Sequence, residues 1–146
     1  LVLTEAVSNT DNMGSIFRNV AAFGGGAMLL DSQSCDPLYR KAIRVSSGQA
    51  LALPFCRGGE ILDIISSVRA AGFTVAALTP RHQARPIKQW VDLPERLALL
   101  VGAEGPGLSA AALAAADCCL SIPMAANVDS LNVATSVAVA MHTLQR

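Results

Sequence analysis

The chain has 146 residues, of which 52% are hydrophobic and 15% charged, so it can bury the core of one compact domain over residues 1–146. Its formal net charge of zero excludes the strongly basic balance of a dedicated nucleic-acid-binding protein. No apolar run approaches the roughly 18 residues of a membrane span, and the N-terminus lacks the basic region and cleavage site of a signal peptide. Because the chain starts at Leu1 rather than Met, we expect either a soluble fragment or a trimmed chain. We also expect a cytoplasmic protein.

Apolar segments of strand length alternate with helical patterns along the chain. The predicted strands cover residues 1–7, 27–31, 51–56, 74–79, 97–103 and 118–124. The predicted helices cover residues 12–23, 37–47, 59–71, 109–116 and 130–145. The strands are nearly continuously apolar, which is typical of strands covered on both faces. This order predicts a parallel six-stranded α/β sheet with helices on both faces and right-handed crossovers.

Side chains that can cap helices stand where the predicted helices begin. Asp11 or Asn12 can cap the first helix, Ser109 the fourth, and Asp129 or Ser130 the last.

The cysteines show no spacing typical of a metal site or a simple disulfide. They are Cys35, Cys56, Cys118 and Cys119, and the adjacent pair on a strand would point to opposite faces of the sheet. We expect reduced, buried thiols and no bound metal.

Two segments carry basic side chains and no acid. Residues 37–57 contain Arg40, Lys41, Arg44 and Arg57, and residues 81–88 contain Arg81, Arg85 and Lys88. They are either local basic patches or ordinary solvated faces.

Polar loops follow four of the predicted strands, at residues 8–14, 78–86, 102–109 and 123–132. In parallel sheets, ligands bind beyond the carboxyl ends of the strands. These four loops are therefore where a functional site is expected.

The loop at residues 102–109 resembles a phosphate-binding loop only superficially. Gly102, Gly105 and Gly107 do not have the dinucleotide-binding spacing, and no Gly-Lys pair follows them. Glu104 would repel a phosphate at this position. The loop therefore favours a neutral or cationic ligand, unless it is simply a tight turn that needs glycine for its dihedral angles.

Other polar side chains stand at the mouths of apolar helices. Asn12, Gly14 and Arg18 open the first helix, where Arg18 needs either a substrate or an acid of its own domain. Ser130 and Asn132 precede the last helix, and capping explains Ser130 more readily than Asn132. The two histidines, His82 and His142, do not support a hydrolase triad.

Three motifs in order resemble those of the SpoU/TrmH family of RNA 2′-O-ribose methyltransferases, in the SPOUT superfamily. They are N-x-G-x-x-x-R at residues 12–18, L-V-G-A-E-G-x-G-L at 100–108 and I-P-M-x-x-x-V-x-S-L-N-V at 122–133. The resemblance implies a C-terminal deep trefoil knot, which contradicts the general rule against knots. It also implies S-adenosylmethionine as cofactor, tRNA or rRNA as substrate, and a homodimer.

The resemblance also assigns roles to residues. The cofactor would bind to Leu78, Thr79, Gly102, Gly105, Ile122, Met124 and Leu131. The catalytic group would be Asn12, Arg18, Glu104, Ser130 and Asn132. We expect Arg18 to stabilise the developing oxyanion and to grip the adjacent phosphate, with Ser130 or water relaying the proton.

Two other functions compete with this interpretation. One is a catalytically inactive, knotted RNA-binding or assembly module. The other is a nucleotide-dependent oxidoreductase on an ordinary doubly wound sheet, which the glycine spacing disfavours.

Overall fold

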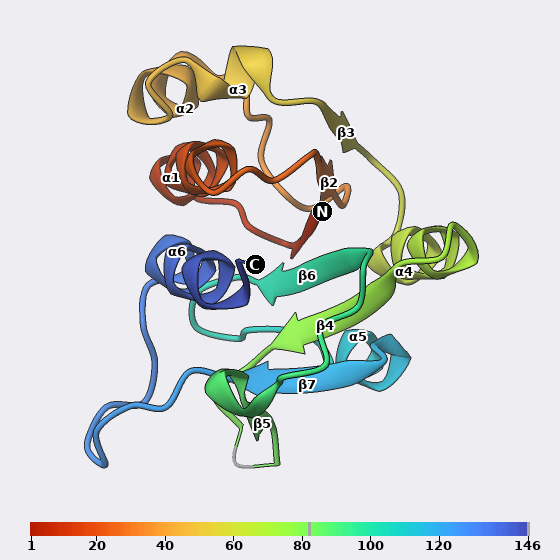
Figure 1. Cartoon of the computed structure of the whole chain (residues 1–146). Coiled ribbons are helices and arrows are strands. Elements are labelled where there is room, and N and C mark those ends of the chain that lie inside the picture. Colours follow the sequence, from red (N-terminus) through yellow and green to blue (C-terminus); the bar gives the residue numbers. More distant parts are fainter. Residues whose placement is uncertain (82, 146) are drawn as a thin grey trace.

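Parallel strands form a single seven-stranded sheet in the computed structural model, which describes residues 1–81 and 83–145 (Figure 1). The strands are β1 (Val2–Glu5), β2 (Met28–Leu30), β3 (Phe55–Arg57), β4 (Thr74–Leu78), β5 (Arg85–Pro86), β6 (Leu97–Gly102) and β7 (Cys118–Ser121). Their order across the sheet is β3-β2-β1-β6-β4-β7-β5. Each neighbouring pair is parallel, so the carboxyl ends of all strands lie at one edge.

Helices connect these strands and cover both faces of the sheet. They are α1 (Thr10–Ala22), α2 (Arg40–Val45), α3 (Gln49–Ala52), α4 (Ile61–Ala70), the 3-10 helix η1 (Ile87–Gln89), α5 (Ala110–Ala115) and α6 (Val133–Leu144). The α1 helix buries Met13, Ile16, Phe17 and Val20, a spacing that places one apolar face on the sheet.

The core divides into two layers, because successive side chains of a strand point to opposite faces. On β4, Ala76 packs in the cluster that contains the buried residues of α1 and α6. Its neighbours Val75 and Ala77 pack in the cluster that contains those of α4 and α5. The parallel α/β class expected from the sequence is confirmed.

The strand count and the third strand were wrong. Of the predicted strand at 51–56, the first residues belong to α3, which begins after Gly48 in the left-handed conformation (φ 82°) and is anchored by a bond from the Ala50 N–H to Ser46 Oγ. An apolar run of this length does not distinguish a short helix from a strand. The extra strand, β5, has only two residues, and its Pro86 is tolerated because β5 lies at the edge of the sheet.

Two predicted helix caps were also wrong, whereas Ser109 caps α5 as predicted. The α1 helix begins earlier than expected and is capped by Asn9, and α6 begins later and is capped by Asn132. In each case an asparagine whose side-chain oxygen reaches two backbone N–H groups replaces the predicted cap.

The cysteines are free, but they are less buried than expected. Cys56 is exposed, and the other three are half-buried. Burial raises the pKa of the Cys35 and Cys118 thiols. In residues 1–81 and 83–145, no cluster of His, Cys, Asp and Glu could hold a metal ion, and no helix is long and apolar enough to span a membrane.

After β7 the chain runs through a long loop and returns to α1 (Figure 1). The α6 helix packs against α1, and Asn19 Nδ2 donates a hydrogen bond to the Ala134 carbonyl at 2.8 Å. This return brings residues 130–132 next to the loop that follows β6.

Candidate functional site

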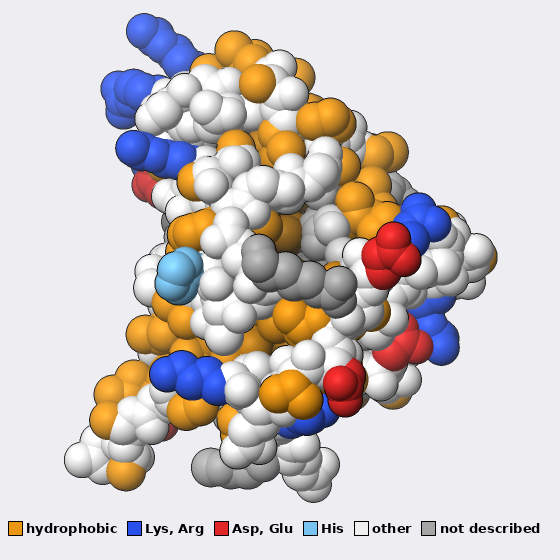
Figure 2. All heavy atoms as spheres, in the orientation of Figure 1, with side chains coloured by type: hydrophobic (Ala, Val, Ile, Leu, Met, Phe, Trp, Pro, Cys, Tyr) orange, Lys and Arg blue, Asp and Glu red, His pale blue; other side chains and the backbone are white. Residues whose placement is uncertain are grey.

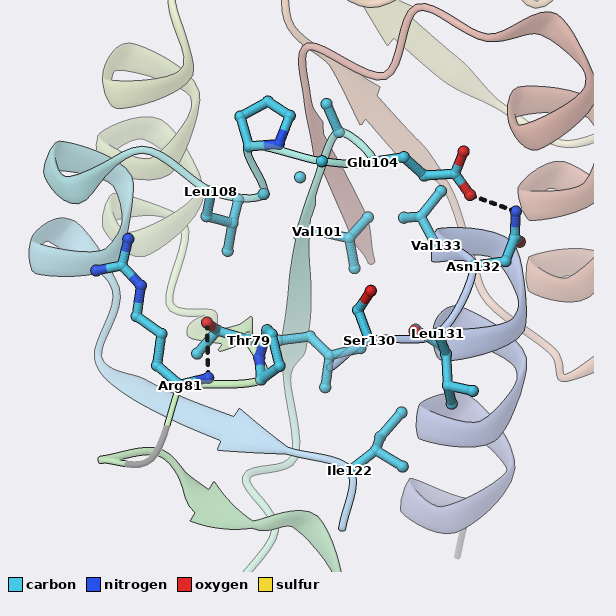
Figure 3. A pocket seen from close by; sticks show the side chains of 18 of the residues that line it. Thr79, Arg81, Val101, Glu104, Leu108, Ile122, Ser130, Leu131, Asn132 and Val133 are labelled. Carbon is cyan, nitrogen blue, oxygen red and sulfur yellow. Dashed lines mark hydrogen bonds between the residues drawn. The ribbon is translucent and has the colours of Figure 1, made fainter. Parts of the chain in front are cut away.

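A pocket of about 370 Å³ lies beyond the carboxyl ends of β4, β6 and β7 (Figure 3). Its walls are residues 78–81 after β4, residues 101–108 around the end of β6, Ile122 and Met124 after β7, and residues 130–133 with Ser136 at the start of α6. All seven residues assigned to the cofactor line this pocket: Leu78, Thr79, Gly102, Gly105, Ile122, Met124 and Leu131. The structure thus brings together residues from four separate segments of the chain.

The glycines of the loop after β6 are required by its backbone. A Cβ atom on Gly102 would lie 2.4 Å from the carbonyl carbon of Gly107 and 2.5 Å from the Leu108 nitrogen, so only glycine fits there. Gly105 and Gly107 have φ angles of 86° and 68°, in the left-handed region that favours glycine. The tight-turn interpretation is therefore confirmed, and the same turn forms one wall of the pocket.

Asn132 joins the three sequence motifs at the rim of the pocket. Its Oδ1 accepts hydrogen bonds from the N–H groups of Ala134 and Thr135, at 2.9 and 3.2 Å, and thereby caps α6. Its Nδ2 donates to Asn12 Oδ1 at 2.8 Å. It also donates to Glu104 Oε1 at 2.5 Å (Figure 3). All four hydrogen-bonding positions of this amide are used, two on the oxygen and two on the nitrogen, which fixes its orientation.

Asn12 is free to take part because Asn9 provides the cap of α1. Asn9 Oδ1 accepts hydrogen bonds from the Asp11 and Asn12 N–H groups, at 2.8 and 3.1 Å. The Asn12 side chain is buried against the start of α6, where it accepts from Asn132. Each of the three motifs therefore contributes one residue to this group of hydrogen bonds, which is centred on Asn132.

The turn between β1 and α1 is held by Asp31, which the sequence analysis did not identify. Ala6 has a positive φ of 54°, and its N–H donates to both carboxylate oxygens of Asp31 at 3.0 and 3.1 Å. Asp31 also accepts from the N–H and the hydroxyl of Ser34, and Ser34 Oγ accepts from the Val7 N–H. Asp31 directly follows the apolar run of β2 at the carboxyl edge of the sheet, a position that could have identified it.

Arg18 is not part of the pocket. It lies exposed on α1 and forms no hydrogen bond or ion pair with any residue of the described chain. The described chain therefore contains no ion pair between Arg18 and an acid of its own domain, the alternative considered above. Ser130 does line the pocket, with its hydroxyl pointing inward (Figure 3).

The described lining contains one acid, Glu104, and one base, Arg81, which lie on opposite sides of the pocket (Figure 3). Most of the remaining lining is apolar or backbone. His82, considered for a catalytic triad, lies outside the described residues.

The chain matches the SpoU rRNA Methylase family over residues 1–142. It is 42% identical over 148 residues to an uncharacterized tRNA/rRNA methyltransferase of Mycobacterium tuberculosis, covering 100% of this chain and 51% of that protein. It is 31% identical over 149 residues to the 23S rRNA (uridine(2479)-2′-O)-methyltransferase of Streptomyces viridochromogenes, covering 99% of this chain and 52% of that protein.

A solved structure shows the same fold. The SpoU methyltransferase AviRb from Streptomyces viridochromogenes, in complex with the cofactor AdoMet, superimposes with a TM-score of 0.86 at 28% identity, covering 97% of this chain and 57% of that one. The chain belongs to the SpoU family of RNA methyltransferases, as its motifs suggested. It spans about half the length of the curated relatives that it matches.

Proposed function

We propose that residues 1–146 are the catalytic domain of an S-adenosylmethionine-dependent enzyme that methylates a ribose 2′-hydroxyl of tRNA or rRNA. The observation that carries this proposal is the meeting of Asn12, Glu104 and Asn132 at the rim of a pocket lined by the seven expected cofactor residues. The 2′-O-methyltransferase from Streptomyces, which matches 99% of this chain over 52% of its own length, supports the same chemistry.

The pocket fits S-adenosylmethionine in size and charge. Its volume falls in the range of about 300–1,000 Å³ that is usual for small-molecule sites. Leu78, Ile122 and Leu131 offer apolar surface to an adenosine, and the Glu104 carboxylate favours a cationic sulfonium over a phosphate. When bound, this cofactor supplies an electrophilic methyl group with a good leaving group.

Arg18 and Ser130 would act on the ribose hydroxyl. A guanidinium is a poor base, so Arg18 would stabilise the developing oxyanion and hold the neighbouring phosphate. The hydroxyl proton would leave through Ser130 or water while the oxygen forms its bond to the methyl carbon. Because Arg18 lies on the exposed face of α1 and outside the pocket lining, the RNA would have to present the reacting hydroxyl within reach of both Arg18 and the pocket.

We further propose the homodimer, the trefoil knot and the cytoplasmic location expected from the family. The return of the chain past the loop after β6 to pack α6 on α1 supports threading. Exposed apolar side chains on and before α6, Val128 and Val139, support association with a second copy. The free cysteines of the described chain are typical of a reducing compartment.

The first test is methyl transfer by Arg18→Lys. The variant keeps the charge but loses the planar fork, so we expect the rate of transfer to RNA to fall at least about a hundredfold with cofactor affinity unchanged. Nucleoside analysis of RNA methylated with labelled S-adenosylmethionine measures the rate and identifies the 2′-O-methylated product, and calorimetry measures cofactor binding. Wild-type turnover by the variant would refute the role of Arg18, and base methylation would refute the ribose assignment.

A further inference from the structure

The exposed face of α2 is strongly basic. Arg40, Lys41 and Arg44 are all exposed, and at 100° per residue they lie within about 100° of the helix circumference. The opposite side, with Ala42, is buried against α1. The three cations therefore point to solvent together.

The α1 helix extends this face. A Cβ atom on Gly14 would lie 2.6 Å from the Ala42 carbonyl oxygen, so the two helices pack with their backbones nearly in contact. Lys41 Nζ lies 2.7 Å from Asp11 Oδ2, which ties the start of α2 to the first turn of α1. Asn12 stands in that same turn, so the start of α2 lies near the rim of the pocket. Figure 2 shows Lys and Arg side chains gathered over α1 and α2.

An aromatic ring stands beside these cations. Tyr39 directly precedes Arg40, its side chain is 60% exposed, and it forms no side-chain cap. An exposed aromatic ring next to arginines is the arrangement on which proteins stack unpaired bases while cations hold the backbone.

We propose that Tyr39, Arg40, Lys41 and Arg44, here called the α2 basic face, bind single-stranded RNA beside the nucleotide to be methylated. The three cations contact phosphates, and Tyr39 stacks on an unpaired base. This inference rests on the proposed function and adds to it the kind of RNA that the enzyme takes, an unpaired loop or end. Asp11 pairs with Lys41, whereas Arg40 and Arg44 form no ion pair with any described residue, so the face keeps unpaired positive charge.

The other cations of the two basic segments have different surroundings. Arg57 Nε donates to the Ser34 carbonyl at 2.8 Å, which gives it a structural contact beside Asp31. Arg85 Nη2 donates to the Gln89 carbonyl in its own loop. Of the first basic segment, three residues therefore form the face and the fourth supports the fold.

The test measures binding of a short single-stranded RNA and of its duplex at several salt concentrations. Replacing Arg40, Lys41 and Arg44 by Gln should lower affinity for the single strand at least about tenfold and reduce the salt slope by about two units, since each phosphate contact contributes about 0.7. The melting temperature and the affinity for S-adenosylmethionine should not change. The control variant Arg69→Gln/Arg96→Gln removes two cations that contact Asp117 and Phe73 elsewhere, and should bind like the wild type.

Tyr39 variants test the stacking. Tyr39→Phe should keep wild-type affinity for the single strand, whereas Tyr39→Leu should lose about tenfold. Unchanged affinity and salt slope in the triple variant would overturn the inference, as would an equal loss of affinity in Arg85→Gln/Lys88→Gln. Tighter binding of the duplex than of the single strand would also overturn it, and so would binding of poly-aspartate as tight as that of the single strand. If RNA binding falls as expected but the wild type transfers no methyl group, the face stands and the proposed activity fails.

Discussion

Asn132 combines a folding role and a site role in one side chain. Its oxygen caps α6, and its nitrogen links Asn12 to Glu104. Asn132→Ala loses both, so we expect the free energy of unfolding to fall by about 1–2 kcal/mol and cofactor affinity to fall with it. Denaturant unfolding and calorimetry with S-adenosylmethionine measure the two effects.

Asn132→Ser separates the two roles. Serine is a good N-cap but has no amide group to bridge two acceptors, so stability should stay near that of the wild type while cofactor affinity falls about as far as in the alanine variant. If the serine variant bound the cofactor normally, capping alone would explain Asn132.

At the scale of elements, the connection from β1 to α1 is fixed by a neighbouring strand. Asp31, at the end of β2, is only 4% exposed and holds the left-handed Ala6 and the side chain of Ser34. Asp31→Asn keeps the shape of the side chain but replaces one carboxylate oxygen by an NH2 group. That group would face the donors of Ala6 and Ser34. We expect it to lose about 2–3 kcal/mol of stability, measured by urea unfolding.

A second aspartate provides the comparison for Asp31. Asp36 accepts one hydrogen bond from the Leu38 N–H in an exposed turn, so Asp36→Asn should cost less than about 1 kcal/mol. Equal urea midpoints for the two variants would show that the Asp31 network does not hold the turn.

The sequence predicted most elements because their signals are local. Continuous apolar runs identified β1, β2, β4, β6 and β7, and the spacing of Met13, Ile16, Phe17 and Val20 identified α1. The α3 helix and the edge strand β5 were missed because their formation depends on long-range packing rather than on a periodic pattern. Asn132 was misjudged for a similar reason, since a cap depends on where the helix begins.

At the scale of the whole molecule, the location of the pocket was predictable but its contacts were not. Parallel strands place their polar loops at one edge, so the four loops could be grouped in advance, and the resemblance to the family added Gly102, Ile122 and Leu131 as cofactor contacts. The bond between Asn12 and Asn132 joins residues 120 positions apart and depends on α6 returning to α1. The exposure of Arg18 does not follow from local sequence patterns either.

The Glu104 carboxylate in the loop after β6 predicts which nucleotides stabilise the protein. A ligand at a hundred times its Kd adds about 2.7 kcal/mol, which for a domain of this size raises the Tm by roughly 5–10 °C. S-adenosylmethionine should give such a shift in a thermal unfolding experiment. ATP and NAD should give little, because Glu104 stands where a phosphate would need free N–H groups.

Two matched variants locate this stabilisation. Leu131→Arg places a bulky cation in the pocket and should abolish the shift with S-adenosylmethionine. Leu51→Arg changes a leucine that is 68% exposed on α3, outside the pocket lining, and should keep it. A shift with NAD that equals or exceeds that with S-adenosylmethionine would instead favour an oxidoreductase, because only a phosphate-accepting pocket could produce it.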